Sequence, residues 1–505
     1  MKGNKRDILS VLLFSILCTI LFHKQDLGLN LIIAETIILS WLIYTKQFKF
    51  KGYYSIAVGI GLIITLLSTL FTHSLFSYIL HFIVLFIFIG LLIYPQTKSL
   101  YFSFGQAFTN LFTSHGELYN KLTSSKLKGR SLKSYIKKIG IFIVPVLIII
   151  FFIIIYRNSN PVFDTLIDEI SRFLGKKLDF IFENLDFYLI SSFIGYVLIS
   201  TFILIRTSNE NLKIMDKNSN EELVRKRKIN LRFFKFNALT NEYKSGVFLL
   251  ITLNLMLLIL NIIDIKWVWF GFEWEGQFLR QFVHEGTYLL ILSILISIIL
   301  VLYYFRRNIN FLKNNRLLKY LSYIWLIQNA ILTFSVGMRN FWYISYFSLA
   351  YKRIGVIIFL ILTIYGLYTV YVKVKNRKSA FYLFKSNFNS FLLVLVLSSL
   401  FNWDSVIAKY NFRNADTSFL HLNYMVTLSD KALPYLDKSI LELEKINKVQ
   451  NQKFRFEQEY MTPERYSSII DNRKENFIKK WENKSTLSWN YPEYKAYKII
   501  VKEWD

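Results

Sequence analysis

The feature that most constrains this chain is a series of long apolar runs that contain almost no charged residues. About 20 apolar residues in a helix span a bilayer, because a helix rises about 1.5 Å per residue and the hydrocarbon core is about 30 Å thick. Backbone groups in lipid must be hydrogen-bonded within their own segment, so these Ile-rich runs are predicted to be helices. The predicted spans, about eleven by this length criterion, are 8–22, 27–44, 54–71, 75–94, 139–156, 187–205, 246–263, 287–305, 320–337, 354–372 and 388–401.

The fold class predicted from these runs is all-α: a multispan transmembrane helix bundle with a small, mainly helical C-terminal domain. The predicted divisions are an N-terminal region of four spans with a basic loop (1–138), a core of seven spans (139–401) and the C-terminal domain (402–505). The last span is short for a crossing, and it can begin near Ala380 if the Lys385 side chain extends to the membrane surface. The loop 161–174 has apolar residues at helical spacing and is predicted to be an amphipathic helix.

The charge of the loops predicts the orientation of the chain. Lys and Arg gather at the N-terminus and in the loops after every second span, for example in 46–51, 126–138 and 225–228. Basic loops face the cytoplasm, so the N-terminus is predicted inside and the C-terminal domain outside. The net charge of +27 does not indicate nucleic-acid binding, because residues 402–505 hold 17 Lys and Arg against 15 Asp and Glu. The excess positive charge therefore lies mainly around the spans.

Motifs for soluble-type catalysis are absent from the sequence. The chain has no phosphate-binding glycine loop and no nucleophile or zinc motif, and its single cysteine, Cys18, cannot form an intramolecular disulfide. We therefore assign no catalytic residue and no metal site, and we expect no cofactor.

Two ionisable residues lie inside predicted spans, which makes them candidates for function. Glu35 is in the second span and His81 is in the fourth. Both spans run in the same direction, and the helix rise places the two residues at similar depths, about 12 and 9 Å from the outer end. They could therefore pair to carry a proton or to bind a polar group. The alternative is an interhelical hydrogen bond that only holds the bundle together.

A second candidate site lies where the last span ends and the C-terminal domain begins. The polar residues there are Asn402, Asp404, Tyr410, Asn411 and Arg413. Asp404 and Arg413 could pair with each other or with a ligand, and the asparagines could cap or orient the segment. The alternative is a capped helix that only leads out of the membrane.

The outer loop 339–353 adds two arginines to this candidate outer surface. Arg339 and Arg353 bracket an aromatic stretch. Arginine forks match phosphate and carboxylate groups, so an anion or lipid-headgroup site is one interpretation. A connector that lies on the membrane surface is the other.

Three passages resemble a family of bacterial multispan membrane proteins, the domain of unknown function 4173 with its 4153 relatives. They are the Asn-Pro-Val-Phe sequence at 160–163, the arginine-bracketed segment 339–353, and the block 402–413 followed by Asp430 and Pro434. The resemblance covers 139–436 and implies a bacterial membrane protein, but it implies no established activity.

Several functions fit these observations. The first is a non-enzymatic membrane protein that handles or senses a solute, a lipid or another component of the cell envelope at its outer face. Its expected partners are the lipid bilayer and a lipid, small solute or envelope protein, and not nucleic acid. A second is an enzyme like the multispan lipid-linked glycosyltransferases, with Asp164, Asp168, Glu273 and Glu275 as candidate carboxylates. A third is a secondary transporter that uses Glu35.

Overall fold

The computed structural model describes residues 2–46, 52–124, 126–127, 130–131, short pieces of 145–153, 155–182, 186–225, 238–270, 276–306, 308–454 and 461–502. These residues are helical apart from loops, one isolated bridge and a two-residue hairpin, in which β1 (Lys126–Leu127) pairs antiparallel with β2 (Arg130–Ser131). The predicted all-α class is therefore confirmed.

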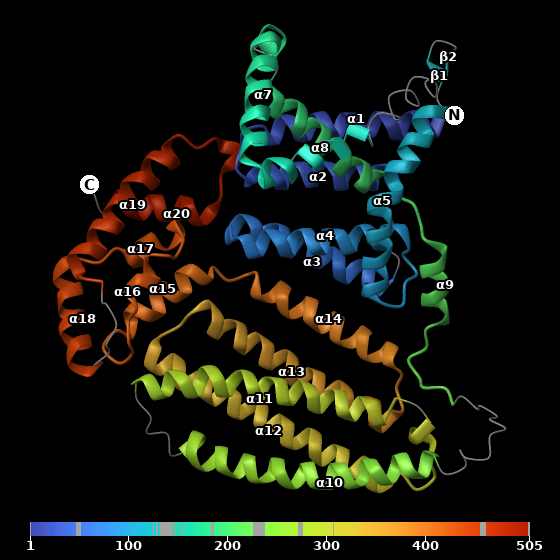
Figure 1. The fold of residues 1–505 in the computed structure, drawn as a ribbon, viewed down its shortest axis with the longest axis vertical. Coiled ribbons are helices and arrows are strands. Elements are labelled where there is room, and N and C mark those ends of the chain that lie inside the picture. The colour runs from blue at the N-terminus through green and yellow to red at the C-terminus, as the bar shows by residue number, and fades with distance from the viewer. Residues whose placement is uncertain are drawn as a thin grey trace.

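The first group of membrane-type helices comes from the N-terminal part of the chain. It comprises α1 (Lys2–Phe22), α2 (Leu29–Tyr44), α3 (Tyr53–Phe71), α4 (Leu75–Ile93) and α8 (Phe187–Leu204). α1 packs against α8, and α3 packs against α4. α5 (Leu100–Ser124) runs across the ends of these helices, and α9 (Glu210–Asn218) lies at that same end (Figure 1).

The second group is built from five longer elements. They are α10 (Ala238–Asp264) with its π-helical extension η2 (Ile265–Phe270), α11 (Gly276–Tyr304), α12 (Arg316–Phe347), α13 (Tyr351–Asn376) and α14 (Ala380–Ser398). α12 packs against α10, α11 and α13, and α14 packs against α13 and α3, so α14 joins the two groups. The short helix η3 (Asn308–Phe311) precedes α12.

Seven helices of the described residues are long and apolar enough to cross a membrane. They are α3, α4, α10, α11, α12, α13 and α14, whereas α2 and α8 are apolar but shorter. α1 covers the predicted span 8–22, and the predicted span 139–156 lies largely outside the described residues. The number of spans, about eleven, therefore stays a prediction.

Two predicted boundaries are wrong. The predicted loop 339–353 is mostly helical, because α12 continues from the predicted span 320–337 to Phe347, and the predicted last span starts too late. The apolar pattern predicts a last span at 388–401, but α14 begins at Ala380 and ends at Ser398. The Ser379 side chain caps its first turn by accepting a hydrogen bond from Tyr382 N. Lys385, the charge that favours a later start, is accommodated because its Nζ lies 2.7 Å from Glu221 Oε1. The longer alternative, which begins near Ala380, is the correct one.

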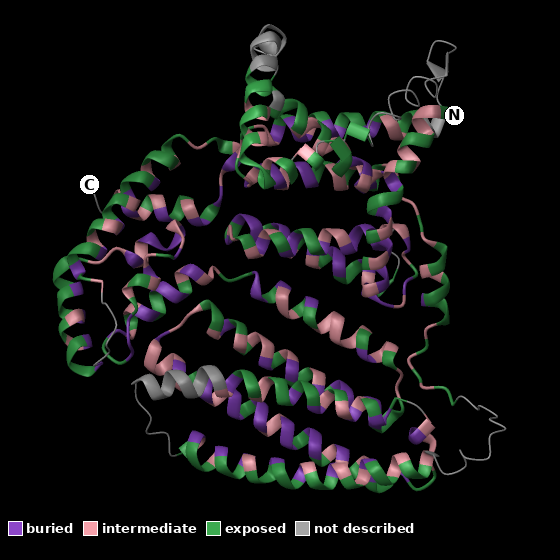
Figure 2. Cartoon of the chain, in the orientation of Figure 1, coloured by how far each residue is buried: buried purple, intermediate pink, exposed green. Residues whose placement is uncertain are grey.

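The exposed surface of the helices is rich in large apolar side chains. On α10, for example, Leu255, Ile259 and Ile262 are each about three-fifths exposed. Exposed residues run along both helix groups in Figure 2, and on α10 and α11 they are mostly apolar. A continuous apolar exterior of this kind is suited to lipid and not to water. Together with the span-length helices, it indicates a protein embedded in a membrane.

The loop 161–174 forms the first part of α7 (Pro161–Phe182), as predicted. Asp164 and Asp168 on this helix both pair with Arg157, at 2.6 and 2.8 Å. Figure 1 shows α7 projecting beyond α1 and α8.

The C-terminal domain packs at the opposite end of the bundle from α9 and the N-terminus (Figure 1). Its elements are α15 (Trp403–Arg413), α16 (Leu422–Met425), η4 (Asp430–Ala432), α17 (Leu433–Leu436), α18 (Ile440–Lys453), α19 (Pro463–Glu482), η5 (Thr486–Ser488) and α20 (Tyr491–Lys502). A single apolar core holds them, with Ile407, Leu433, Tyr466 and Ile500 fully buried, and it extends to Ile354 at the start of α13.

Candidate functional site

The exit from α14 into the C-terminal domain is a capped helix start. Asn402 is the N-cap of α15, and its side-chain oxygen accepts a hydrogen bond from Ser405 N. Asp404 follows in the first turn, where a carboxylate is favoured by the helix dipole. This local arrangement follows directly from the sequence Asn-Trp-Asp-Ser.

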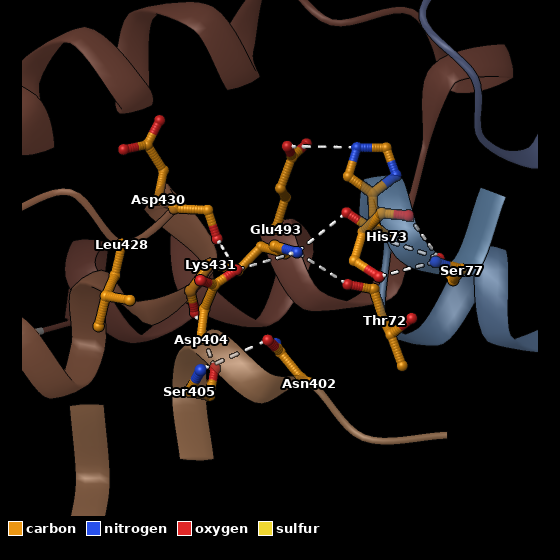
Figure 3. Close-up of polar contacts among 12 residues, drawn as sticks. Thr72, His73, Ser77, Asn402, Asp404, Ser405, Leu428, Asp430, Lys431 and Glu493 are labelled. Carbon is orange, nitrogen blue, oxygen red and sulfur yellow. Dashed lines mark hydrogen bonds and ion pairs between the residues drawn. The ribbon is translucent and has the colours of Figure 1, made fainter. Parts of the chain in front are cut away.

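Asp404 is buried and contacts residues from distant parts of the chain (Figure 3). One oxygen accepts a hydrogen bond from the Tyr351 hydroxyl at 2.7 Å, and the other from the Ser429 hydroxyl at 2.5 Å. Lys431 Nζ lies 3.5 Å from the same carboxylate. A buried carboxylate is costly unless it is paired and hydrogen-bonded, so these partners fix α15 against η4 and the start of α13.

Lys431 connects the C-terminal domain to the α3–α4 loop of the bundle (Figure 3). Its Nζ donates to the carbonyl oxygens of Thr72 and His73, both at 3.0 Å. The residue is only 7% exposed. Burial lowers the pKa of its ammonium group, while the Asp404 carboxylate opposes that shift.

His73 forms the other half of this contact. Its Nε2 lies 3.5 Å from Glu493 Oε1, at the start of α20. Glu493 also accepts hydrogen bonds from Lys484 and, at 2.8 Å, from Asn490. Burial lowers the pKa of His73 to about 4, even though Glu493 favours its charged form.

The backbone of the C-terminal domain also contacts the α1–α2 loop. Leu29 N donates to Trp489 O at 3.0 Å, and the Ser488 hydroxyl donates to Gln25 Oε1 at 3.0 Å. Gly28 approaches Ser488 so closely that a Cβ at this position would lie 2.6 Å from the Ser488 carbonyl carbon and oxygen. Only glycine fits without moving one of the two segments.

The predicted outer residues divide between two faces of α15. Asn411 is buried and clamps Leu349, accepting from its N–H at 2.7 Å and donating to its carbonyl at 3.0 Å. Tyr410 and Arg413 lie on the exposed face. Asp404 and Arg413 therefore do not share a face, and the partners of Asp404 are Tyr351, Ser429 and Lys431.

Arg339 and Arg353, the two arginines that the sequence suggests for an anion site, both contact other residues of the protein. Arg339 on α12 forms a buried ion pair with Asp264 at the end of α10, with Nη2 2.5 Å from Oδ1. Arg353 donates to the carbonyls of Phe347, at 2.6 Å, and Ser348, and its guanidinium lies 4.4 Å from the centre of the Tyr343 ring. Arg353 thereby satisfies the carbonyl groups at the end of α12.

The structure brings together the two parts of the predicted outer surface, which the sequence links only by their order. Asn411 with Leu349, and Asp404 with Tyr351, join α15 directly to the α12–α13 loop. Lys431, His73 and Glu493 complete the arrangement, but sequence reasoning missed all three. Lys431 follows Asp430 in a polar turn and has no local pattern that distinguishes it from a solvated lysine.

The intramembrane pair is formed. His81 Nε2 on α4 lies 2.6 Å from Glu35 Oε1 on α2, and His81 Nδ1 lies 3.1 Å from the Thr65 hydroxyl on α3. His81 is fully buried and Glu35 is 6% exposed. The pair links α2 to the α3–α4 layer within an apolar environment.

Metal binding finds no support in this geometry. Within the part of the chain that the structure describes, no group of three or more His, Cys, Asp or Glu side chains is placed to hold a metal ion.

Comparison with known protein families identifies the family of this chain. The model of a family described as Domain of unknown function (DUF4153) matches residues 8–439. The chain belongs to the DUF4153 family. The resemblance to family 4173 with its 4153 relatives was therefore close, but the family shown is DUF4153, and the match begins in α1, well before residue 139. No curated protein and no solved structure matches the chain.

The DUF4153 match covers only part of the contact between the C-terminal domain and the bundle. It includes His73, Asp404 and Lys431, and it ends before α18. Lys484 and Glu493, which face His73 from the other side, lie beyond it.

Proposed function

We propose that this DUF4153 protein handles or senses an envelope component, lipid or small solute at the outer face of the bacterial cytoplasmic membrane. In this proposal the N-terminus is cytoplasmic and the C-terminal domain is extracytoplasmic. Its partners are the bilayer and the recognised envelope molecule or protein, and not nucleic acid. The protein acts without a catalytic centre or a cofactor of its own.

The observation that carries this proposal is the two-faced geometry of α15. Its buried face, with Asp404 and Asn411, is fixed to the α12–α13 loop and to η4. Its exposed face presents Tyr410 and Arg413 at the end of the bundle. The Arg413 guanidinium suits an anionic ligand such as a phosphate or carboxylate group, and the Tyr410 hydroxyl can donate a hydrogen bond to such a group. The rigid attachment of α15 would transmit the occupancy of that face to the spans below.

The test is complementation of a deletion strain, with envelope lipids and glycans profiled together with stress phenotypes. Tyr410→Ala combined with Arg413→Ala removes the exposed face and leaves the buried contacts in place. We expect this double variant to reach normal abundance and to fail to restore the wild-type profile. Lys448→Ala with Lys479→Ala, on exposed positions of α18 and α19, is the matched control and should restore it. Full rescue by the Tyr410/Arg413 variant would refute recognition through α15.

The proposed orientation has its own test, because Cys18 is the only cysteine. In a Cys18→Ser background, Lys409→Cys on α15 and Lys217→Cys on α9 place single thiols on exposed positions at opposite ends of the bundle. A membrane-impermeant maleimide should label the first in intact cells and the second only after lysis. The reverse pattern would invert the proposed topology.

The other two functions stay open as alternatives. For the glycosyltransferase-like enzyme, Asp164 and Asp168 are both engaged by Arg157, and Glu273 and Glu275 lie outside the described residues. For the secondary transporter, the contact between Glu35 and His81 is the supporting observation.

A further inference from the structure

A cavity lies inside the first helix group, next to Glu35. It has a volume of about 160 Å³, is lined by side chains of α1, α2, α4 and α8, and is partly open to the surface of the helix group. Its apolar walls include Leu31, Ala34, Leu85 and Ile203. It lies within the membrane-type helices, away from the outer surface formed by α15 and the α12–α13 loop.

One polar group of this wall has unused hydrogen-bonding capacity. Glu35 lines the cavity and is more than nine-tenths buried. Its Oε1 contacts His81, but its Oε2 has no hydrogen-bond partner among the described residues. An unsatisfied buried carboxyl oxygen costs free energy of folding, so a donor that reaches it from the cavity would be stabilised there.

The hydrogen bonds around His81 indicate the charge that such a donor would meet. The Thr65 hydroxyl has one hydrogen, which it donates to the Gly61 carbonyl at 2.9 Å, so His81 Nδ1 donates to the Thr65 oxygen. The Nε2–Oε1 contact then holds one shared proton, either as a neutral acid and imidazole or as a carboxylate and imidazolium. Both of these forms are neutral overall.

The size of the cavity limits what can bind. An engineered apolar cavity of about 150 Å³ stays dry and binds benzene. A cavity of about 160 Å³ therefore holds a group of about six or seven heavy atoms by the same measure. A neutral donor suits the neutral pair, whereas an ammonium group would bring an unbalanced charge into an apolar wall.

We propose that this cavity binds a membrane-soluble alcohol. The apolar part next to the hydroxyl packs against the walls, and the hydroxyl donates a hydrogen bond to Glu35 Oε2. The membrane supplies such molecules laterally, so the site requires no aqueous entry path. The walls provide affinity through apolar contact, and Glu35 selects for the hydroxyl group.

The test uses three small probes on the full-length protein in lipid nanodiscs. Cyclohexanol carries the hydroxyl, methylcyclohexane has the same number of heavy atoms without it, and cyclohexylamine carries a cation. We expect cyclohexanol to raise the Tm by about 1–3 °C at saturation and methylcyclohexane to raise it less. Glu35→Met, which removes the acceptor oxygen, should weaken cyclohexanol binding about tenfold and leave methylcyclohexane unchanged.

Ala34→Leu is the control for the cavity itself, because Ala34 lines it and a larger side chain fills it. All probe effects should vanish in this variant, whereas general effects on the bilayer would persist. Cys18 gives a second readout that does not depend on a variant folding, because this single thiol also lines the cavity. Cyclohexanol should slow its reaction with a membrane-permeant thiol reagent. Equal effects of methylcyclohexane, tighter binding of cyclohexylamine, or unchanged Cys18 reactivity would each overturn the proposal.

Discussion

Lys431 Nζ lies 3.0 Å from the carbonyl oxygen of His73, and this hydrogen bond joins the C-terminal domain to a loop near the start of the chain. The same ammonium group contacts Thr72 and Asp404. A single buried cation therefore connects three segments, and its removal should weaken the packing of all three.

We expect Lys431→Met to destabilise the docked C-terminal domain by about 2–4 kcal/mol, because two carbonyl oxygens and Asp404 lose their buried cationic partner. The measurement is thermal unfolding of the purified protein, with protease sensitivity of the C-terminal domain as the local readout. Lys409→Met, at an exposed position on α15, should change neither. Equal behaviour of the two variants would show that the Lys431 contacts contribute little.

Docking should weaken in mild acid because of His73. Burial lowers the pKa of its imidazole from 6.5 to about 4 in the docked state. Below pH 6.5 the undocked state takes up a proton that the docked state does not, so docking is favoured above this pH and loses up to about 3 kcal/mol by pH 4. The neighbouring groups are Glu493, Lys484, Lys431 and Asp26.

The pH dependence can be followed as the protease sensitivity of the C-terminal domain between pH 7 and 4. His73→Gln should flatten this profile between pH 6.5 and 4. Glu493 would still contribute at the acid end, because burial raises the pKa of its carboxyl but the hydrogen bonds from Lys484 and Asn490, which remain in this variant, lower it. An unchanged profile in His73→Gln would assign the pH dependence to other groups.

Gly28→Ala should displace the C-terminal domain from the α1–α2 loop. The new methyl group would lie 2.6 Å from the Ser488 backbone, which cannot move as a flexible side chain could. We expect a loss of about 1–3 kcal/mol in thermal unfolding, as for other overpacked contacts. Gly195→Ala on α8 is the matched control, because a Cβ at that position would have no neighbouring atom within 4 Å among the described residues. It should be neutral or slightly stabilising.

The buried pair of Arg339 and Asp264 should show strong coupling in a double-mutant cycle. Arg339→Met alone leaves the Asp264 carboxylate buried without its cation, with an expected cost of about 3–5 kcal/mol. Adding Asp264→Leu should recover much of this loss, because the second buried charge is removed as well. Folded yield and Tm in nanodiscs are the measurements, and additive losses would contradict a direct pair.

Regular helix geometry made part of this structure predictable from the sequence. The apolar runs indicate the positions of most long helices, and the helix rise places Glu35 and His81 at similar depths, where they contact each other at 2.6 Å. These inferences succeed because lipid enforces helical hydrogen bonding and because a helix converts residue number into depth.

Long-range contacts between segments were not predictable in the same way. Asp404 and Arg413 are close in sequence, yet they lie on different faces of α15. The contacts of Asp404 with Ser429 and Lys431 join segments that are well separated in the sequence. The partners of Lys431 lie more than 350 residues away, at Thr72 and His73. A carbonyl oxygen carries no side-chain signature, so no sequence pattern could identify these two acceptors.

The order of synthesis gives these docking contacts a further consequence. Gly28, Thr72 and His73 are made early, but Trp489 and Glu493, which contact this end of the bundle, are made much later. Domains fold as the chain emerges, N-terminal parts first. The early helices must therefore hold these loops ready for a partner segment that is synthesised much later. A chain that stops short of α20 would leave that surface uncovered, so docking distinguishes chains that contain α20 from chains that lack it.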